Sequence, residues 1–174
     1  MTEKNIVLIG MRGSGKSTIG KMLANLLKRQ LIDTDHLIEK KENNQIKDIV
    51  ANMGWAYFRE KEIEAVKELE KLEQKIISTG GGVVLNEENI ISLKKNGLLI
   101  FINSPVEILQ KRVQVKEKRP SLNGQDAVLE IPKVWEERKN LYLNSADLIY
   151  EKQELELDEN DALNIIEMVN KKTP

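Results

Sequence analysis

The chain has 174 residues, of which 40% are hydrophobic and 32% are charged, which fits one domain with a real core and a polar surface. Its 27 Lys and Arg residues against 28 Asp and Glu residues give a net charge of −1, which excludes a general attraction to nucleic acid or to acidic membranes. Cysteine is absent, which excludes disulfides and thiolate metal sites.

Apolar runs alternate with helical patterns along the whole chain. Strands are expected at 5–9, 31–33, 75–79, 98–102 and 146–150. Helices are expected at 16–29, 34–41, 46–51, 55–73, 86–95, 106–113, 126–143 and 159–170. This alternation predicts a parallel sheet covered by helices on both faces, and ligands bind such sheets beyond the carboxyl ends of the strands. Pro132 is expected to break or kink the segment 126–143.

The first expected strand leads into a glycine-rich loop. Residues 10–17 have the sequence GMRGSGKS, which matches the phosphate-loop pattern G-x-x-x-x-G-K-[ST]. In such a loop the lysine, here Lys16, reaches the β- and γ-phosphates, and the hydroxyl of Ser17 ligates Mg²⁺. The expected nucleotide-binding residues are Gly13, Ser14, Gly15, Lys16, Ser17 and Thr18. An apolar strand before the loop and an amphipathic helix after it favour a nucleotide site over a chance glycine-rich turn.

Other features narrow the class of nucleotide-binding protein. The Asn-Lys-x-Asp motif that GTPases use to recognise the base is absent. The apolar strand at 98–102 is followed by Asn103 and Ser104, whereas ATPases driven by DNA or protein usually have an Asp at such a strand end. Together with the short chain, these features favour a kinase that acts on a small molecule.

Two acids follow the second expected strand. Asp33 and Asp35 are two residues apart, so both point to the same side if the chain stays extended there. Phosphoryl transfer needs one group that orders the metal and one that orients the attacking hydroxyl, and these two carboxylates fit both needs. The alternative is that Asp33 or Thr34 only caps the following helix.

Two further motifs predict a binding site for the phosphoryl acceptor. Gly80, Gly81 and Gly82 follow the third strand and would let a ligand lie directly on the backbone, although a flexible turn is the alternative. On the helix at 55–73, Glu62 interrupts the apolar stripe and lies three residues after Arg59. An arginine oriented by this acid would bind a carboxylate with two hydrogen bonds, and a surface ion pair is the alternative.

A polar stretch at 116–124 lies between two expected helices. It contains Arg119 followed by Pro120, which suggests an arginine presented on a lid at about 114–125. A solvated basic loop is the alternative.

Taken together, these residues resemble the shikimate kinase family. The resemblance runs in order and spacing from about residue 5 to residue 150. It is carried by the loop 10–17, Asp33-Thr34-Asp35, Phe58-Arg59-x-x-Glu62, Gly80-Gly81-Gly82, Arg119-Pro120 and Arg138-x-x-Leu141-Tyr142. It implies ATP-dependent phosphorylation of the 3-hydroxyl of shikimate in aromatic amino-acid biosynthesis. It also implies a three-layer α/β/α P-loop kinase fold with a five-stranded parallel sheet and a mobile lid.

The resemblance also implies roles for single residues. Asp35 would hold the acceptor diol, Asp33 would order Mg²⁺ through water, and Ser78 would share that water. Arg59 and Arg138 would bind the substrate carboxylate. The other substrate-binding residues would be Phe58, Glu62, Gly80, Gly81 and Gly82. Arg112 would lie against adenine, and Arg119 would reach the phosphates. The catalytic residues would be Lys16, Asp33, Asp35 and Arg119.

Two departures from the family pattern stand out. Gly54 is followed by Trp55 where the family usually has Glu, which predicts a loss of helix stability rather than of chemistry. The usual Asp-Thr and Pro after the last strand are replaced by Glu151-Lys152-Gln153.

The sequence also leaves two rival functions open. A kinase of another polyol acid, such as gluconate, fits less well because the paired arginines and residues 80–82 suit a planar carboxylated ring. The other rival, a silent regulatory module, would not need Lys16, Ser17 and both acids.

The expected organisation is simple. One kinase domain spans 1–174, with a substrate-binding helical segment at about 34–62. We expect a cytoplasmic monomer that uses ATP, Mg²⁺ and a small-molecule substrate, without nucleic acid or membrane. The first apolar run, residues 6–9, is too short for a signal sequence or a membrane span.

Overall fold

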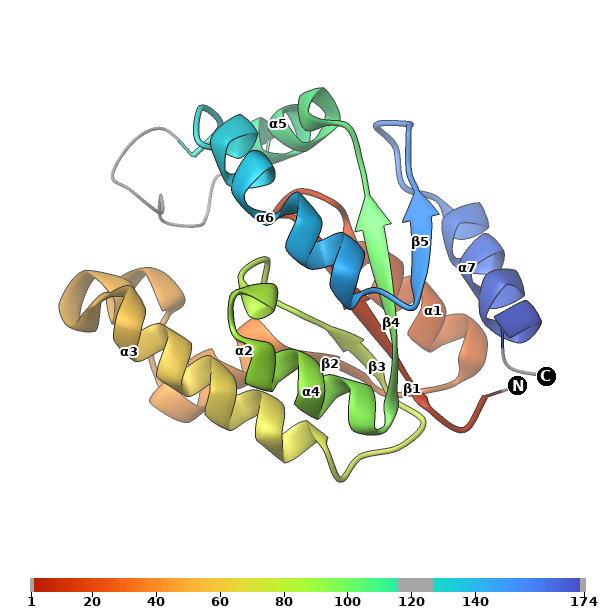
Figure 1. Ribbon diagram of the computed structural model, residues 1–174, viewed down its shortest axis with the longest axis horizontal. Helices are drawn as coiled ribbons and strands as arrows, with labels where there is room; N and C mark the ends of the chain where they lie inside the picture. The colour runs from red at the N-terminus through yellow and green to blue at the C-terminus, as the bar shows by residue number, and fades with distance from the viewer. Residues whose placement is uncertain (1, 116–126, 173–174) are drawn as a thin grey trace.

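The protein is a three-layer α/β/α structure built on one parallel sheet (Figure 1). The computed structural model describes residues 2–115 and 127–172. The sheet has five strands in the order β2-β3-β1-β4-β5, and every pair of neighbours is parallel. The strands are β1 (Asn5–Ile9), β2 (Leu31–Asp33), β3 (Ile76–Ser78), β4 (Gly97–Asn103) and β5 (Leu148–Glu151). The fold class predicted from the sequence is confirmed.

The helices cover both faces of the sheet. They are α1 (Lys16–Leu27), α2 (Thr34–Glu42), α3 (Ile46–Leu69), α4 (Glu87–Lys95), α5 (Val106–Val115), α6 (Ile131–Ser145) and α7 (Glu159–Lys172). A 3-10 turn, η1, spans Val83–Leu85. Successive residues of β1 point to opposite faces, so Ile6 packs with side chains of α1 and α7, whereas Val7 packs with side chains of α3 to α6. Burial on both faces explains why β1 and β4 are continuous apolar runs.

The strand register brings the candidate functional residues to one edge of the sheet. Leu8 of β1 lies opposite Ser78 of β3, and Ser78 lies opposite Asp33 of β2. The segments that follow β1, β2 and β3 therefore leave the sheet side by side. This arrangement places the loop 10–17, the acid pair and the glycine triplet next to one another.

One local prediction differs from the structure, and another is confirmed. Pro132 does not break a helix: α6 begins at Ile131, so the proline lies in its first turn, where the missing N–H costs nothing. The two helices expected at 46–51 and 55–73 are confirmed: α3 consists of two helical parts that meet at a kink at Gly54. Gly54 has φ of 81°, a left-handed value that glycine tolerates, and this residue redirects the chain between the two halves. No helix within 2–115 or 127–172 is long and apolar enough to cross a membrane.

Candidate active site

The loop after β1 is curved around its own lysine. Lys16 is buried, and its Nζ donates to the carbonyl oxygens of Gly10 and Met11, both at 2.9 Å. Gly13 and Gly15 have φ of 81° and 97°, which side-chain-bearing residues rarely adopt. Because α1 begins at Lys16, its N-terminal N–H groups and partial positive charge point at this loop. This geometry fits the binding of phosphates.

Two hydroxyls and a carboxylate meet beside the loop. The Oγ of Ser17 donates to Oδ2 of Asp33 at 2.8 Å and lies 3.1 Å from Oγ of Ser78. The other oxygen of Asp33 accepts from the backbone N–H groups of Asp35 and His36 at 3.1 and 3.3 Å. Asp33 therefore caps α2, which confirms the alternative interpretation of the sequence, and its other oxygen faces Ser17. Hard oxygen ligands of this kind fit Mg²⁺, which keeps several waters and binds substrate phosphates as well.

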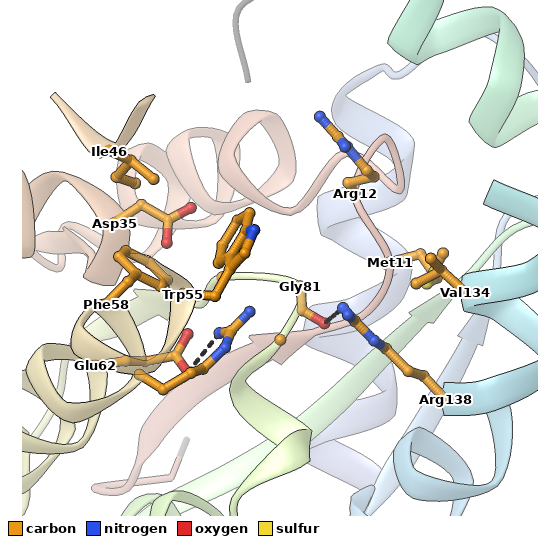
Figure 2. A pocket seen from close by; sticks show the side chains of 13 residues that line it. Met11, Arg12, Asp35, Ile46, Trp55, Phe58, Glu62, Gly81, Val134 and Arg138 are labelled. Atoms are coloured by element: carbon orange, nitrogen blue, oxygen red, sulfur yellow. Dashed lines mark hydrogen bonds and ion pairs between the residues drawn. The ribbon is translucent and has the colours of Figure 1, made fainter. Parts of the chain in front are cut away.

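A pocket opens next to the phosphate loop, between α3 on one side and α6 on the other (Figure 2). It is lined by Met11, Arg12, Asp35, Ile46, Trp55, Phe58, Arg59, Glu62, Gly80, Gly81, Gly82, Val134 and Arg138. The pocket thus contains all of the substrate-binding residues predicted from the sequence. We call it the acceptor pocket.

Two acids converge over the glycine floor of the acceptor pocket. A Cβ on Gly80 would lie 2.7 Å from Oδ1 of Asp35 and 3.1 Å from Oε1 of Glu62. A Cβ on Gly81 would lie 3.2 Å from the backbone N of Arg12, in the phosphate loop. The absence of side chains at these positions therefore lets the acids and the phosphate loop approach the floor closely. The floor is further fixed by Thr34, whose buried Oγ1 accepts from the N–H of Gly80 at 3.1 Å.

Arg59 is held from several directions at the α3 side of the pocket. Its Nη1 donates to Oε2 of Glu62 at 2.8 Å. Its guanidinium carbon lies 5.5 Å from the ring centre of Trp55 and 5.2 Å from that of Phe58. A cation within about 6 Å of an aromatic face is attracted to it. Trp55 therefore lines the pocket and contacts Arg59, and its effect on helix stability stays a prediction.

Glu62 is a buried acid in this arrangement. Burial raises the pKa of its carboxyl above the ordinary value, while the charge and hydrogen bond of Arg59 act in the opposite direction. Its Oε1 is buried and has no hydrogen-bond partner among the described residues. Such a group is costly to leave unsatisfied, so a ligand that donates a hydrogen bond to it would gain affinity.

We expect Glu62→Gln to gain stability relative to the wild type as the pH rises. An acid whose pKa is higher in the folded state makes that state bind more protons, so the free energy of unfolding falls as pH rises between the two pKa values. Glutamine lacks this titration. Urea unfolding of both proteins between about pH 4 and about pH 8 measures the difference. Glu60→Gln, on the exposed side of α3, is the control, and parallel pH curves for Glu62→Gln and wild type would contradict the expectation.

Arg138 and Tyr142 fix the floor from α6. Nη1 of Arg138 donates to the carbonyl of Gly81 at 3.2 Å, and the hydroxyl of Tyr142 donates to the same oxygen. Burial raises the pKa of Tyr142 to about 12, so this hydroxyl stays protonated as a donor. Nε of Arg138 is buried and has no hydrogen-bond partner in the part of the chain that the structure describes. Arg138 therefore lines the pocket with an N–H donor that could bind an anion.

Arg112 lies on the other side of the phosphate loop. Its guanidinium donates to the carbonyls of Gly13 and Ser14 and to those of Glu154 and Leu155, at 2.7 to 3.3 Å. The arginine therefore connects the phosphate loop to the segment after β5. That segment is anchored by Lys152, whose Nζ lies 2.9 Å from a carboxylate oxygen of the buried Asp161.

The remaining sequence predictions fall as follows. Thr18 lies in the first turn of α1, as expected for the phosphate-loop pattern. Arg119 and nearly all of the expected lid lie at 116–126, outside the described residues. The pocket-lining residues not predicted from the sequence are Met11, Arg12, Ile46, Trp55 and Val134. Val134 could have been found from its spacing of four residues before Arg138, which places both on one face of a helix.

A phosphate loop after β1, a hydroxyl–carboxylate cluster beside that loop and an adjoining pocket with three arginines define a P-loop kinase of small molecules. The family model for shikimate kinase matches residues 12–170. The chain belongs to the shikimate kinase family, whose members phosphorylate shikimate with ATP in aromatic amino-acid biosynthesis.

Individual relatives agree with this assignment. A shikimate kinase of Clostridium botulinum strain 657 is 46% identical over 148 residues, which cover 84% of this chain and 86% of the relative. Shikimate kinase 2 of Photorhabdus laumondii is 40% identical over 83% of this chain and 84% of its own. The structure of shikimate kinase from Acinetobacter baumannii in complex with shikimate is 29% identical, has a TM-score of 0.91, and the match covers 99% of this chain and 96% of that one.

Proposed function

We propose that the protein transfers the γ-phosphoryl group of ATP to the 3-hydroxyl of shikimate, giving shikimate 3-phosphate and ADP. One observation carries the proposal: two acids, three arginines and a glycine floor converge in a pocket that touches the phosphate loop. A planar ring with a carboxylate at one end and hydroxyls at the other suits such a pocket. The related Acinetobacter enzyme, described with shikimate, supports the choice of acceptor.

On the nucleotide side, the loop N–H groups of Gly13, Ser14 and Gly15 bind the phosphates, and Lys16 neutralises charge on the transferred group. Thr18, which follows Ser17 in the first turn of α1, is assigned to the same nucleotide site. Mg²⁺ would be held by Ser17 and, through water, by Asp33 and Ser78, and it would neutralise charge on the phosphates. The short distances among these three side chains support the assignment.

On the acceptor side, Asp35 orients the attacking hydroxyl and accepts its proton as the phosphoryl group arrives. Arg59 and Arg138 bind the carboxylate, and Glu62 orients Arg59. Gly80, Gly81 and Gly82 let the ring lie against the backbone, with Phe58 beside it. These groups hold the hydroxyl in line with the γ-phosphate, which supplies much of the rate enhancement in reactions of this type.

Two arginines complete the proposal for the nucleotide. We assign Arg112 to the adenine of the nucleotide, and its hydrogen bonds to the carbonyls of Gly13 and Ser14 in the phosphate loop support this. Arg119 reaching the phosphates from a lid at about 114–125 remains a prediction from the sequence. A single kinase domain at 1–174, with the segment at about 34–62 closing one side of the acceptor pocket, is our proposal for the organisation of the chain.

A coupled ADP-release assay tests the function directly. With shikimate we expect turnover, and with gluconate or with no acceptor we expect none above background. Turnover with gluconate alone would favour the rival polyol-acid kinase. No turnover with either acceptor, in a protein that binds ATP, would favour a regulatory module.

We also propose that a monomer in the cytoplasm carries out the reaction. The net charge of −1 supports independence from nucleic acid and membranes. Size-exclusion chromatography with light scattering at assay concentrations measures the oligomeric state.

We expect Arg59→Lys to raise the KM for shikimate with a smaller effect on kcat. A lysine cannot form the two parallel hydrogen bonds that a guanidinium makes with a carboxylate. The expected loss is about 1.5–3 kcal/mol, the range for a hydrogen bond to a charged group. Lys67→Ala, which removes an exposed cation from the same helix, should leave the KM unchanged. An unchanged KM in Arg59→Lys would mean that Arg59 is only a partner of Glu62.

A further inference from the structure

Arg12 is one of two residues of the phosphate loop that line the acceptor pocket, and the other, Met11, is apolar. Arg12 follows Met11, whose carbonyl accepts from Nζ of Lys16 at 2.9 Å. Its backbone lies against the floor, because a Cβ on Gly81 would be 3.2 Å from the N of Arg12. The phosphate-loop pattern leaves this position unspecified, so any residue could stand there. In this chain a cation stands at the boundary between the nucleotide phosphates and the acceptor.

Glu130 faces Arg12 from the start of α6. Its Oε2 lies 3.8 Å from Nη1 of Arg12, and the residue is 2% exposed. A buried carboxylate is costly without a nearby cation, so the pair restrains where Arg12 can lie. Glu130, Val134 and Arg138 follow at intervals of four residues, which places them on one face of the helix. On that face, Glu130 pairs with Arg12, and Arg138 donates to the carbonyl of Gly81 in the pocket floor.

The position of Arg12 in the pocket matches the site of the reaction. Figure 2 draws Arg12 and Asp35 in the upper part of the pocket and Arg138 in the lower part. In the proposed function the carboxylate binds at the end with Arg138, and the reacting hydroxyl faces Asp35. After transfer, the new phosphate group therefore lies at the end where Arg12 is.

We propose that Arg12 is an additional anion-binding residue of the acceptor pocket, positioned by Glu130, and that its guanidinium binds the phosphate group of the phosphorylated product. This inference rests on the proposed function. A guanidinium has five N–H donors in a planar fork that matches two oxygens of a phosphate. It can therefore face Glu130 with one edge and the product with another. Binding of the transferred phosphate would stabilise it on the acceptor as it leaves ADP.

Isothermal titration calorimetry with shikimate and with shikimate 3-phosphate tests the role of Arg12. The two ligands share the carboxylate and differ in the phosphate, so the ratio of their Kd values isolates the phosphate contact. Arg12→Met should raise the Kd of the product about tenfold or more, and that of shikimate less than about threefold. Arg12→Lys keeps the positive charge but lacks the planar fork of donors, so its Kd for the product should lie between those of the wild type and Arg12→Met. Lys133→Met, which removes an exposed cation from α6, should change neither Kd.

A double-mutant cycle tests the role of Glu130. Glu130→Gln should weaken product binding in the wild-type background and should have no further effect in the Arg12→Met background, because it acts through Arg12. Glu137→Gln, an exposed acid on the same helix, is the control. Any other pattern, including equal losses in both backgrounds, overturns positioning by Glu130.

The outcomes separate this inference from the proposed function. If the wild type neither phosphorylates shikimate nor binds it, the proposed function fails. A second outcome is that the wild type is active, while Arg12→Met raises the Kd of both ligands equally and lowers the Tm. The Arg12–Glu130 pair then only connects the phosphate loop to α6. In that case the inference about Arg12 fails and the proposed function stands. An unchanged Kd of the product in folded Arg12→Met or Arg12→Lys also overturns the inference.

Discussion

Lys16→Ala should abolish turnover and leave the fold intact. Lys16 is the point charge that the proposed mechanism places on the transferred phosphoryl group, and a preorganised charge of this kind typically contributes about 10²–10³ or more in kcat. The side chain is buried against Gly10 and Met11, to whose carbonyls it donates. Its removal therefore opens a small space in the loop, but it takes no apolar side chain out of the core. Steady-state assays with shikimate, together with thermal unfolding, measure the two effects separately.

Lys21→Ala is the matched control, because Lys21 is an exposed lysine on the same helix. It should retain wild-type turnover. A folded Lys16→Ala variant with near-normal kcat would contradict the assignment of residues 10–17 as the phosphate loop. An unfolded variant would instead show that the two hydrogen bonds to the loop carbonyls stabilise the fold, and Lys16→Met, which keeps the length of the aliphatic stem, would then replace it.

The fold could be predicted because its signals are local and repeated. Val7 and Ile6 belong to a run with no polar residue, and such a run between helical patterns predicts a strand buried on both faces. Pro132 was misplaced for a related reason: a proline breaks a helix interior but suits a first turn, and the sequence does not mark where α6 begins. The kink at Gly54 depends on a positive φ, which the sequence permits and does not require.

Much of the candidate site could also be predicted, because its residues follow strand ends or break a helical stripe. Glu62 was identified as an acid on an apolar stripe, and the structure buries it there. Arg12 and Trp55 could not be assigned in this way. Arg12 enters the pocket because the loop curves around Lys16, and Trp55 enters it because the chain turns at Gly54. Both depend on the path of the backbone, which motif spacing does not describe.

Asp35→Asn should lower turnover far more than it lowers ATP binding. Asp35 is buried in the acceptor pocket, where it would accept the proton of the attacking hydroxyl. An amide is of similar size and cannot accept that proton, so the loss should fall in the range of general base catalysis, about 10²–10⁴-fold in kcat. Its backbone N–H, which donates to Oδ1 of Asp33 at 3.1 Å, is unchanged by the substitution, so the start of α2 should persist.

Asp33→Asn is the informative comparison, since the two acids are two residues apart and the structure assigns them different neighbours. Oδ2 of Asp33 accepts from Ser17 in the phosphate loop, whereas Asp35 lines the acceptor pocket. Asp33→Asn should therefore raise the Mg²⁺ concentration needed for half-maximal rate, and Asp35→Asn should not. Nucleotide binding by calorimetry, measured beside steady-state rates over a range of Mg²⁺ concentrations, distinguishes them. If ATP affinity collapses in Asp35→Asn and saturating ATP restores the rate, Asp35 belongs to the nucleotide site, and the proton must leave the hydroxyl by another route.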